Sequence, residues 1–166
     1  MSLFRSARRA PSDQDQVDER LERVTALVYA LLHDVAAWLS DLQAPVNVEL
    51  YPEYRLRGVA DLASPRERMG RYASPALLAS WGDVLDRWVA SGYHYRPSFG
   101  RNLRVAVTEG GGEGLKAEVT FQDRSEIELP GGGREAPGRR WQLTVWIADD
   151  LRQVRTVVIR EVSAGL

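Results

Sequence analysis

Few side chains in this sequence could carry acid–base or metal chemistry. The chain has no cysteine and only two histidines, His33 and His94. Without thiolates, disulfides and cysteine nucleophiles are excluded, and two histidines are too few for a histidine-rich metal cage. The G-x-S-x-G, H-E-x-x-H and strand-linked G-x-G-x-x-G motifs are also missing from the sequence. We therefore expect no metal, no cofactor and no catalytic residue of a readily recognised type.

Aromatic and histidine side chains cluster in two places that could form a ligand pocket. Tyr29 and His33 are four residues apart and share one face of a predicted helix, while Tyr93 and His94 directly follow another. The segment 93–97 predicts either a packed hinge or the lining of a pocket. Convergence of both histidines in one cavity would favour a small-molecule enzyme or ligand-binding protein over a protein-binding module. The candidate pocket comprises Tyr29, His33, Trp81, Trp88, Tyr93 and His94.

An apolar patch is expected on the outer face of the predicted sheet. Trp146 alternates with Leu143, Val145 and Ile147 and so lies on the opposite face of its strand, and residues 157–159 present apolar groups on both faces. Such patches commonly mark interfaces, although the amino-terminal helix of the same chain could also cover this one. We predict a homodimer or another protein as partner, bound through Trp146, Val157 and Ile159.

The charge distribution argues against nucleic acid as a partner. The net charge is -1, and the basic residues, of which only Lys116 is a lysine, are spread along the whole chain. This preference for arginine is typical of a GC-rich bacterial genome. The glycine-rich stretches 110–114 and 131–133 connect predicted strands and precede no helix, so we interpret them as hairpin loops and not as phosphate cradles.

A long helix is predicted to begin at Ser12 and to be closed by Pro45. Ser12 can cap the first free amides, and the acidic residues that follow oppose the positive end of the helix dipole. The most apolar piece, residues 24–39, contains His33 and Asp34 and is shorter than the roughly 20 apolar residues of a membrane span. We expect a cytoplasmic protein. Apolar residues at heptad spacing form the buried seam of this helix: Val17, Leu21, Val24, Val28, Leu31, Val35, Trp38 and Leu42.

The remaining elements predict an α+β fold. Residues 46–51 and 54–59 suggest a strand pair, and the Ser64-Pro65 and Ser74-Pro75 pairs each begin a helix, the second ending at Gly92. After residue 100 the pattern alternates, which indicates strands at 103–108, 115–122, 127–129, 141–147 and 154–162. We expect two main helices and a short one on one face of a curved antiparallel sheet of about four to six strands. Residues 1–11 are expected to form a flexible basic arm, and residues 12–166 a single domain.

This order of elements over residues 13–162 resembles the nuclear-transport-factor-like (SnoaL-like) α+β cone. The resemblance implies a curved sheet that encloses a pocket against its helices, and dimerisation through the outer sheet face. Enzymes of that family place carboxylates and histidines inside the cone, whereas the inward positions predicted here, such as Leu103, Val119 and Leu143, are mostly apolar. Our first hypothesis is therefore a non-catalytic dimerising or protein-binding module with an apolar pocket. The alternative is a small-molecule enzyme or ligand-binding protein that uses a pocket between helices and sheet.

Overall fold

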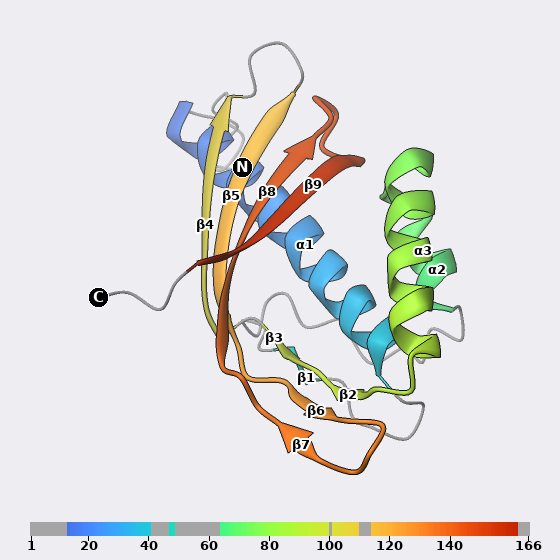
Figure 1. Ribbon diagram of the computed structural model, residues 1–166. Coiled ribbons are helices and arrows are strands. Elements are labelled where there is room, and N and C mark those ends of the chain that lie inside the picture. The colour runs from blue at the N-terminus through green and yellow to red at the C-terminus, as the bar shows by residue number, and fades with distance from the viewer. Residues whose placement is uncertain (1–12, 41–46, 49–63, 100, 110–113, 163–166) are drawn as a thin grey trace, which may run out of the picture.

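Helices lie along one face of a curved antiparallel sheet in the computed structural model of the chain (Figure 1). The structure describes residues 13–40, 47–48, 64–99, 101–109 and 114–162, and the statements below concern these residues. Segregation of the helices to one sheet face confirms the predicted α+β class. None of the described helices combines the length and apolar character that a membrane span requires.

The long helix α1 spans Asp13–Leu39 and crosses the inner face of the sheet. The predicted seam is confirmed in its middle, where Val24, Val28 and Leu31 are almost completely buried in the core. The helix ends earlier than predicted, and Ser40 instead forms an isolated bridge with Tyr95. This bridge ties the end of α1 to the strand that follows α3.

The two serine-proline starts are both confirmed. Ser64 caps α2 (Pro65–Met69), and Ser74 caps α3 (Pro75–Ala90), each through a side-chain oxygen that accepts a backbone N–H of the first turn. Proline occupies the first turn of each helix, where its missing N–H costs no hydrogen bond. Gly92 has a φ of 85°, the left-handed conformation expected just beyond the end of α3.

The main sheet has the strand order β4-β5-β8-β9, and all its pairs are antiparallel. Alternate residues of β5 and β8 are buried on the inner face, including Val119 and Val145 at 0% exposure. The alternating pattern therefore predicted which side chains form the core. The strands are β4 (Arg101–Glu109), β5 (Leu115–Asp123), β8 (Arg139–Ile147) and β9 (Val154–Val162).

Two smaller sheets lie beneath the carboxyl end of α1 (Figure 1). One joins β2 (His94–Arg96), β6 (Glu126–Glu128) and β7 (Arg134–Glu135) in antiparallel order. The other pairs β1 (Asn47–Val48) with β3 (Ser98–Phe99) in parallel. This partner of β1 was not predicted. The strand expected at 54–59 lies outside the described residues.

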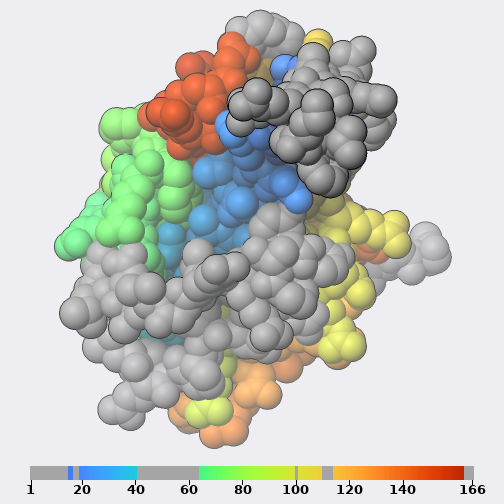
Figure 2. All heavy atoms as spheres, turned by 180° about the vertical axis from the view of Figure 1, so that it is seen from behind, coloured from blue at the N-terminus to red at the C-terminus, as the bar shows by residue number. Residues whose placement is uncertain are grey.

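From behind, α1 is flanked by α2 and α3 on one side and by β4 on the other (Figure 2). The helices and the sheet thus enclose a shared interior. Its upper part is the packed core of α1 against β5 and β8. Its lower part, between the second half of α1 and α3, holds the candidate site.

Candidate functional site

A cavity of about 370 Å³ lies between α1, α3 and the inner face of the main sheet. The second half of α1 supplies one wall, and one face of α3 supplies another. The sheet contributes from β5, β8 and β9, with β2 and β3 below. The lining residues are Leu31, Leu32, Val35, Leu39, Ser80, Trp81, Val84, Leu85, Tyr95, Phe99, Phe121, Asp123, Trp141, Leu143 and Ile159.

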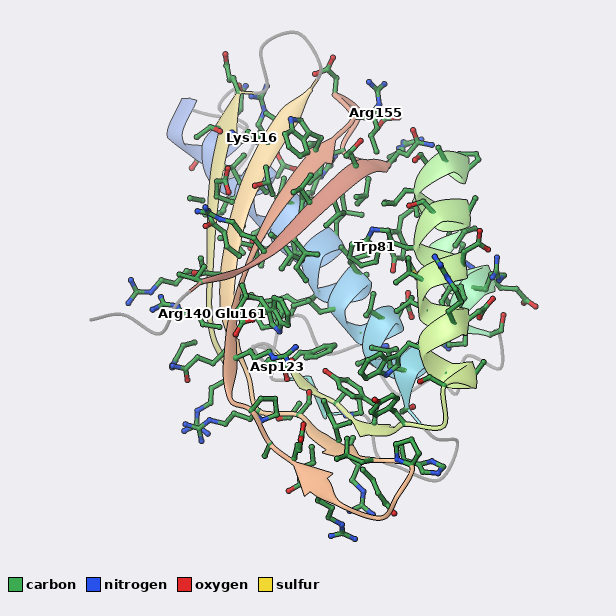
Figure 3. All side chains as sticks on the ribbon, viewed as in Figure 1. Trp81, Lys116, Asp123, Arg140, Arg155 and Glu161 are labelled. Atoms are coloured by element: carbon green, nitrogen blue, oxygen red, sulfur yellow. The ribbon has the colours of Figure 1, made fainter. Side chains whose placement is uncertain are left out.

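Most of this lining is aliphatic or aromatic, and part of it reaches the surface. Val84 on α3 is 55% exposed and Ile159 on the edge strand β9 is 48% exposed, so both wall residues also meet solvent. Trp81 projects from α3 into the space between that helix and the sheet (Figure 3). The cavity is therefore an apolar pocket whose wall between α3 and β9 borders solvent.

Asp123 is the one carboxylate in this lining. It ends β5, is 7% exposed, and lies near the bend of the sheet (Figure 3). One oxygen, Oδ2, accepts hydrogen bonds from Trp141 Nε1 at 2.9 Å and from the Tyr95 hydroxyl at 3.2 Å. The other, Oδ1, accepts the backbone N–H of Ser125 at 2.8 Å. The carboxylate is thus fixed in place by three donors from three segments of the chain.

The Tyr95 phenol stays protonated at neutral pH. Burial raises the pKa of Tyr95 first, and the negative charge of Asp123 raises it further. A neutral phenol can donate its proton to the carboxylate, which is the bond that the geometry shows. The polar end of the pocket therefore combines one carboxylate with neutral hydrogen-bond donors.

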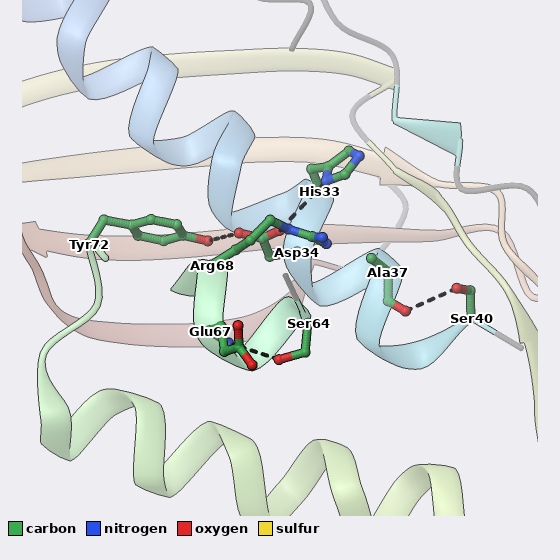
Figure 4. Close-up of polar contacts among 8 residues, drawn as sticks. All are labelled: His33, Asp34, Ala37, Ser40, Ser64, Glu67, Arg68 and Tyr72. Carbon is green, nitrogen blue, oxygen red and sulfur yellow. Dashed lines mark hydrogen bonds and ion pairs between the residues drawn. The ribbon is translucent and has the colours of Figure 1, made fainter. Parts of the chain in front are cut away.

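Of the six residues predicted for a pocket, the structure places only Trp81 in this lining. Tyr29 is 3% exposed and belongs to the buried hydrophobic residues outside the pocket. Trp88 and Tyr93 stack on each other with ring centres 5.0 Å apart at the end of α3. His94 is an exposed residue of β2. His33 lies beside Asp34 on α1, outside the pocket lining (Figure 4). The two histidines do not converge, so a pocket built on both of them was the wrong prediction.

Tyr95 and Asp123 were not predicted as site residues, although both lie in a sequence pattern with the period of two that is typical of a strand. Tyr95 is the inward residue of a three-residue strand whose neighbours His94 and Arg96 face outward, a period of two that we interpreted as a hinge. Asp123 continues the buried alternation of β5 one residue beyond the predicted strand limit at residue 122, whereas no strand was predicted around Tyr95.

His33 and Asp34 belong to a polar cluster that joins α1 to α2 (Figure 4). Asp34 is 3% exposed; its Oδ1 accepts from Arg68 Nε at 2.7 Å, and its Oδ2 accepts from the Tyr72 hydroxyl at 2.7 Å. His33 Nδ1 lies 3.6 Å from the same carboxylate. The cluster contributes no residue to the pocket lining.

The Asp34 cluster predicts a loss of stability in acid. Burial raises the pKa of Asp34, but the close approach of His33, the hydrogen bonds from Arg68 and Tyr72, and the Arg68 charge outweigh it and lower the pKa below its ordinary value. A lowered folded pKa means that the ionised carboxylate stabilises the fold above about pH 3.9, its unfolded value, and that this stabilisation is lost as the pH falls through the folded value.

Denaturant unfolding of the wild type and of Asp34→Asn between pH 7 and pH 2 measures how much the ionised Asp34 carboxylate stabilises the fold at each pH. The wild type should exceed the variant in free energy of unfolding by a constant amount above about pH 5, and the excess should shrink below about pH 3.9. An excess that stayed constant down to pH 2 would show that Asp34 has no such role.

The three residues predicted for one interface do not share a face. Val157 lies opposite Val145 and Ile159 opposite Leu143, so both point to the inner side, where Val157 is buried and Ile159 lines the pocket. Trp146 lies on the outer side, as predicted, beside Lys116, whose ammonium is 6.0 Å from the ring. The error arose because three consecutive apolar residues in β9 left the choice of face open.

The outer face is mainly a polar network. Glu118 accepts hydrogen bonds from Gln142 and Thr144, and Gln142 in turn accepts from Arg160. Val158, 52% exposed, is the neighbour of Ile159 that does lie on this side. The predicted homodimer or partner surface would therefore have to include Trp146 and Val158, and it stays a prediction.

No family model and no curated protein matches the sequence. One solved structure similar to this chain is the solution NMR structure of a de novo designed β-sheet protein, with 18% identity, a TM-score of 0.48, and coverage of 88% of this chain and 93% of that one. Another is the crystal structure of the intermembrane space region of the chloroplast protein ARC6, with 12% identity, a TM-score of 0.49, and coverage of 92% and 100%. Both scores are too low to carry an argument about fold or function. The resemblance to the nuclear-transport-factor-like cone stays a prediction.

Proposed function

We propose that this protein is a non-catalytic binding module that takes a small, mostly apolar ligand in the pocket between α1, α3 and the sheet. The observation that carries the proposal is the cavity of about 370 Å³ with its nearly continuous apolar lining. Ligand sites in proteins are typically pockets of about 300–1,000 Å³ with mostly apolar walls and a few placed polar groups. This pocket has that size and composition.

The chemistry of the lining supports binding more than catalysis. Asp123 is held by three hydrogen bonds, and the pKa of Tyr95 is raised first by burial, so the phenol is not a base at neutral pH. Both histidines, the usual acid–base groups near neutral pH, lie outside the lining. Within the described residues, the carboxylate of the pocket is thus held by hydrogen bonds and neither histidine reaches it.

The affinity should come from the removal of apolar surface from water. Each methylene buried contributes about 0.8 kcal/mol, which corresponds to about a fourfold gain in affinity. Linear alcohols from butanol to octanol should therefore bind with dissociation constants that fall about fourfold per added carbon until the pocket is filled. Isothermal titration calorimetry of the full chain with this series measures the increment.

Two adjacent residues of β9 supply a matched pair of variants. Ile159 and Val158 have nearly equal exposure, 48% and 52%, but only Ile159 lines the pocket. Ile159→Asp should weaken octanol binding at least tenfold, because a charge that must remain hydrated then faces the apolar ligand. Val158→Asp should leave the affinity unchanged. Equal effects of the two substitutions, or no octanol binding by the wild type, would overturn the proposed function.

A further inference from the structure

The pocket contains a charge that its apolar walls do not explain. Asp123 is more than nine-tenths buried, yet it lies in a lining made of leucine, valine, isoleucine and aromatic side chains. Burial of an ionised carboxylate is costly unless hydrogen bonds or an opposite charge compensate it. The groups that face Asp123 therefore indicate what a ligand would have to supply.

The hydrogen bonds to Asp123 leave its charge in place. All three donors, Tyr95, Trp141 and the Ser125 backbone, are neutral. They stabilise the carboxylate without cancelling its charge. A carboxylate offers about four lone-pair positions, of which these donors use three, and among the described residues Oδ1 accepts one bond, from Ser125. One acceptor position at Oδ1 therefore remains for a further donor.

The basic residue paired with Asp123 in the β5–β8 ladder forms no ion pair with it. Arg139 lies opposite Asp123 in the β5–β8 ladder, but its guanidinium carbon lies 5.7 Å from the centre of the Trp141 ring and the residue is exposed to water. Among the described residues, none of the ion pairs includes Asp123. The positive charge of Arg139 lowers the pKa of Tyr95, whose hydroxyl donates to Asp123, so it is felt at this end of the pocket, but Arg139 is exposed and water screens its charge in part. A negative potential therefore persists at the polar end of the pocket.

We propose that the ligand is a hydrophobic amine, whose protonated nitrogen pairs with Asp123 while its apolar body occupies the pocket between α1 and the sheet. This inference rests on the proposed function, since it assigns a ligand class to the same pocket. An ammonium group matches the site because it brings both the missing positive charge and N–H donors for Oδ1. A carboxylate ligand would be repelled by the charge of Asp123, and a neutral alcohol would gain at most one ordinary hydrogen bond.

Three ligands with the same alkyl chain test the inference: octylammonium, octanol and octanoate, titrated calorimetrically into the full chain at pH 7 and low salt. We expect octylammonium to bind at least tenfold more tightly than octanol, and octanoate to bind most weakly. In Asp123→Asn the preference for octylammonium over octanol should fall below threefold. Glu118→Gln is the control, because it neutralises a carboxylate of the same strand β5 on the outer face, outside the pocket lining, and it should keep the tenfold preference.

The outcomes separate the two proposals. If octanol binds the wild type as tightly as octylammonium, the amine inference is overturned and the apolar pocket stands. If none of the three ligands binds, the proposed function itself fails. Should Asp123→Asn not fold, NMR of the wild type decides, because the methylene next to the ammonium should show a nuclear Overhauser effect to the Trp141 indole N–H that is bonded to Asp123. Absence of that effect in a saturated complex overturns the inference.

Discussion

Replacing Gly114 with alanine should lower the free energy of unfolding by about 2–5 kcal/mol. Gly114 precedes β5 and has a φ of 95°, a conformation that costs a residue with a β-carbon about 1–2 kcal/mol. A β-carbon built there would lie 2.1 Å from the carbonyl oxygen of Ile147, far inside the normal contact distance. Because that oxygen belongs to the backbone of β8, relief of the clash requires the β5–β8 pair to shift. Denaturant unfolding monitored by circular dichroism measures the loss.

Gly132→Ala is the matched control for this prediction. Gly132 has a similar φ of 90°, but nothing lies within 4 Å of the position where its β-carbon would be. Gly132→Ala should therefore lower the free energy of unfolding only by the cost of a left-handed backbone conformation, about 1–2 kcal/mol. The difference between the two variants isolates the contact of Gly114 with β8. Equal losses in both would contradict the close approach of the two chain segments.

Those elements of the fold that follow one clear local pattern in the sequence could be predicted. The middle of the heptad seam of α1 and the two capped serine-proline starts follow local patterns of this kind, and the structure confirms them, whereas Leu21 of the predicted seam is 38% exposed. The small sheets were not predictable in the same way. Their strands have two or three residues, which is too short for a periodicity, and β1 pairs with a segment some fifty positions away in the chain. Tertiary contacts select such pairings.

The pocket was predictable in kind but not in composition. Most of its aliphatic wall was expected to face inward, because Leu31, Val35 and Leu143 follow clear helical or strand periods. The aromatic cluster near Tyr93 was misleading, since neighbours in sequence alternate between faces once the chain becomes a strand. His94 then points outward while Tyr95 points into the pocket. The direction of a side chain in a short strand depends on the register with its partner, which the sequence does not display.

Register also explains why Asp123 could not be recognised as a site residue from the sequence. The ladder between β5 and β8 places Asp123, at the end of β5, opposite Arg139, at the start of β8. Trp141, two residues after Arg139, donates its indole N–H to Asp123. Tyr95 arrives from β2, which pairs with β6 in another sheet. Three segments that are separate in sequence thus define one polar point. Only their assembly reveals that a carboxylate lies at the end of an apolar pocket.

Asp34→Ala should destabilise the protein by about 3 kcal/mol, the second large effect that we expect. The substitution removes the carboxylate that accepts hydrogen bonds from Arg68 Nε and the Tyr72 hydroxyl, each 2.7 Å from Asp34 in the wild type. Removal of one partner of a buried ion pair costs about 3–5 kcal/mol. The Arg68 side chain is 18% exposed, so water recovers part of this cost and the lower end of the range applies.

Two controls distinguish this buried charge from an ordinary contact. Tyr72→Phe removes one hydrogen bond to Asp34 and should cost about 1 kcal/mol. Asp86→Ala makes the same substitution at an exposed pair, where Arg66 and Asp86 are 2.9 Å apart at 48% and 57% exposure, and it should cost less than about 1 kcal/mol. Each Asp substitution removes two hydrogen bonds, one from an arginine of α2 and one from an aromatic side chain, which is Tyr72 at Asp34 and Trp38 at Asp86. The two variants therefore differ mainly in burial. If Asp34→Ala cost no more than Asp86→Ala, α2 would be held to α1 by apolar packing, with Met69 at 0% exposure as its anchor.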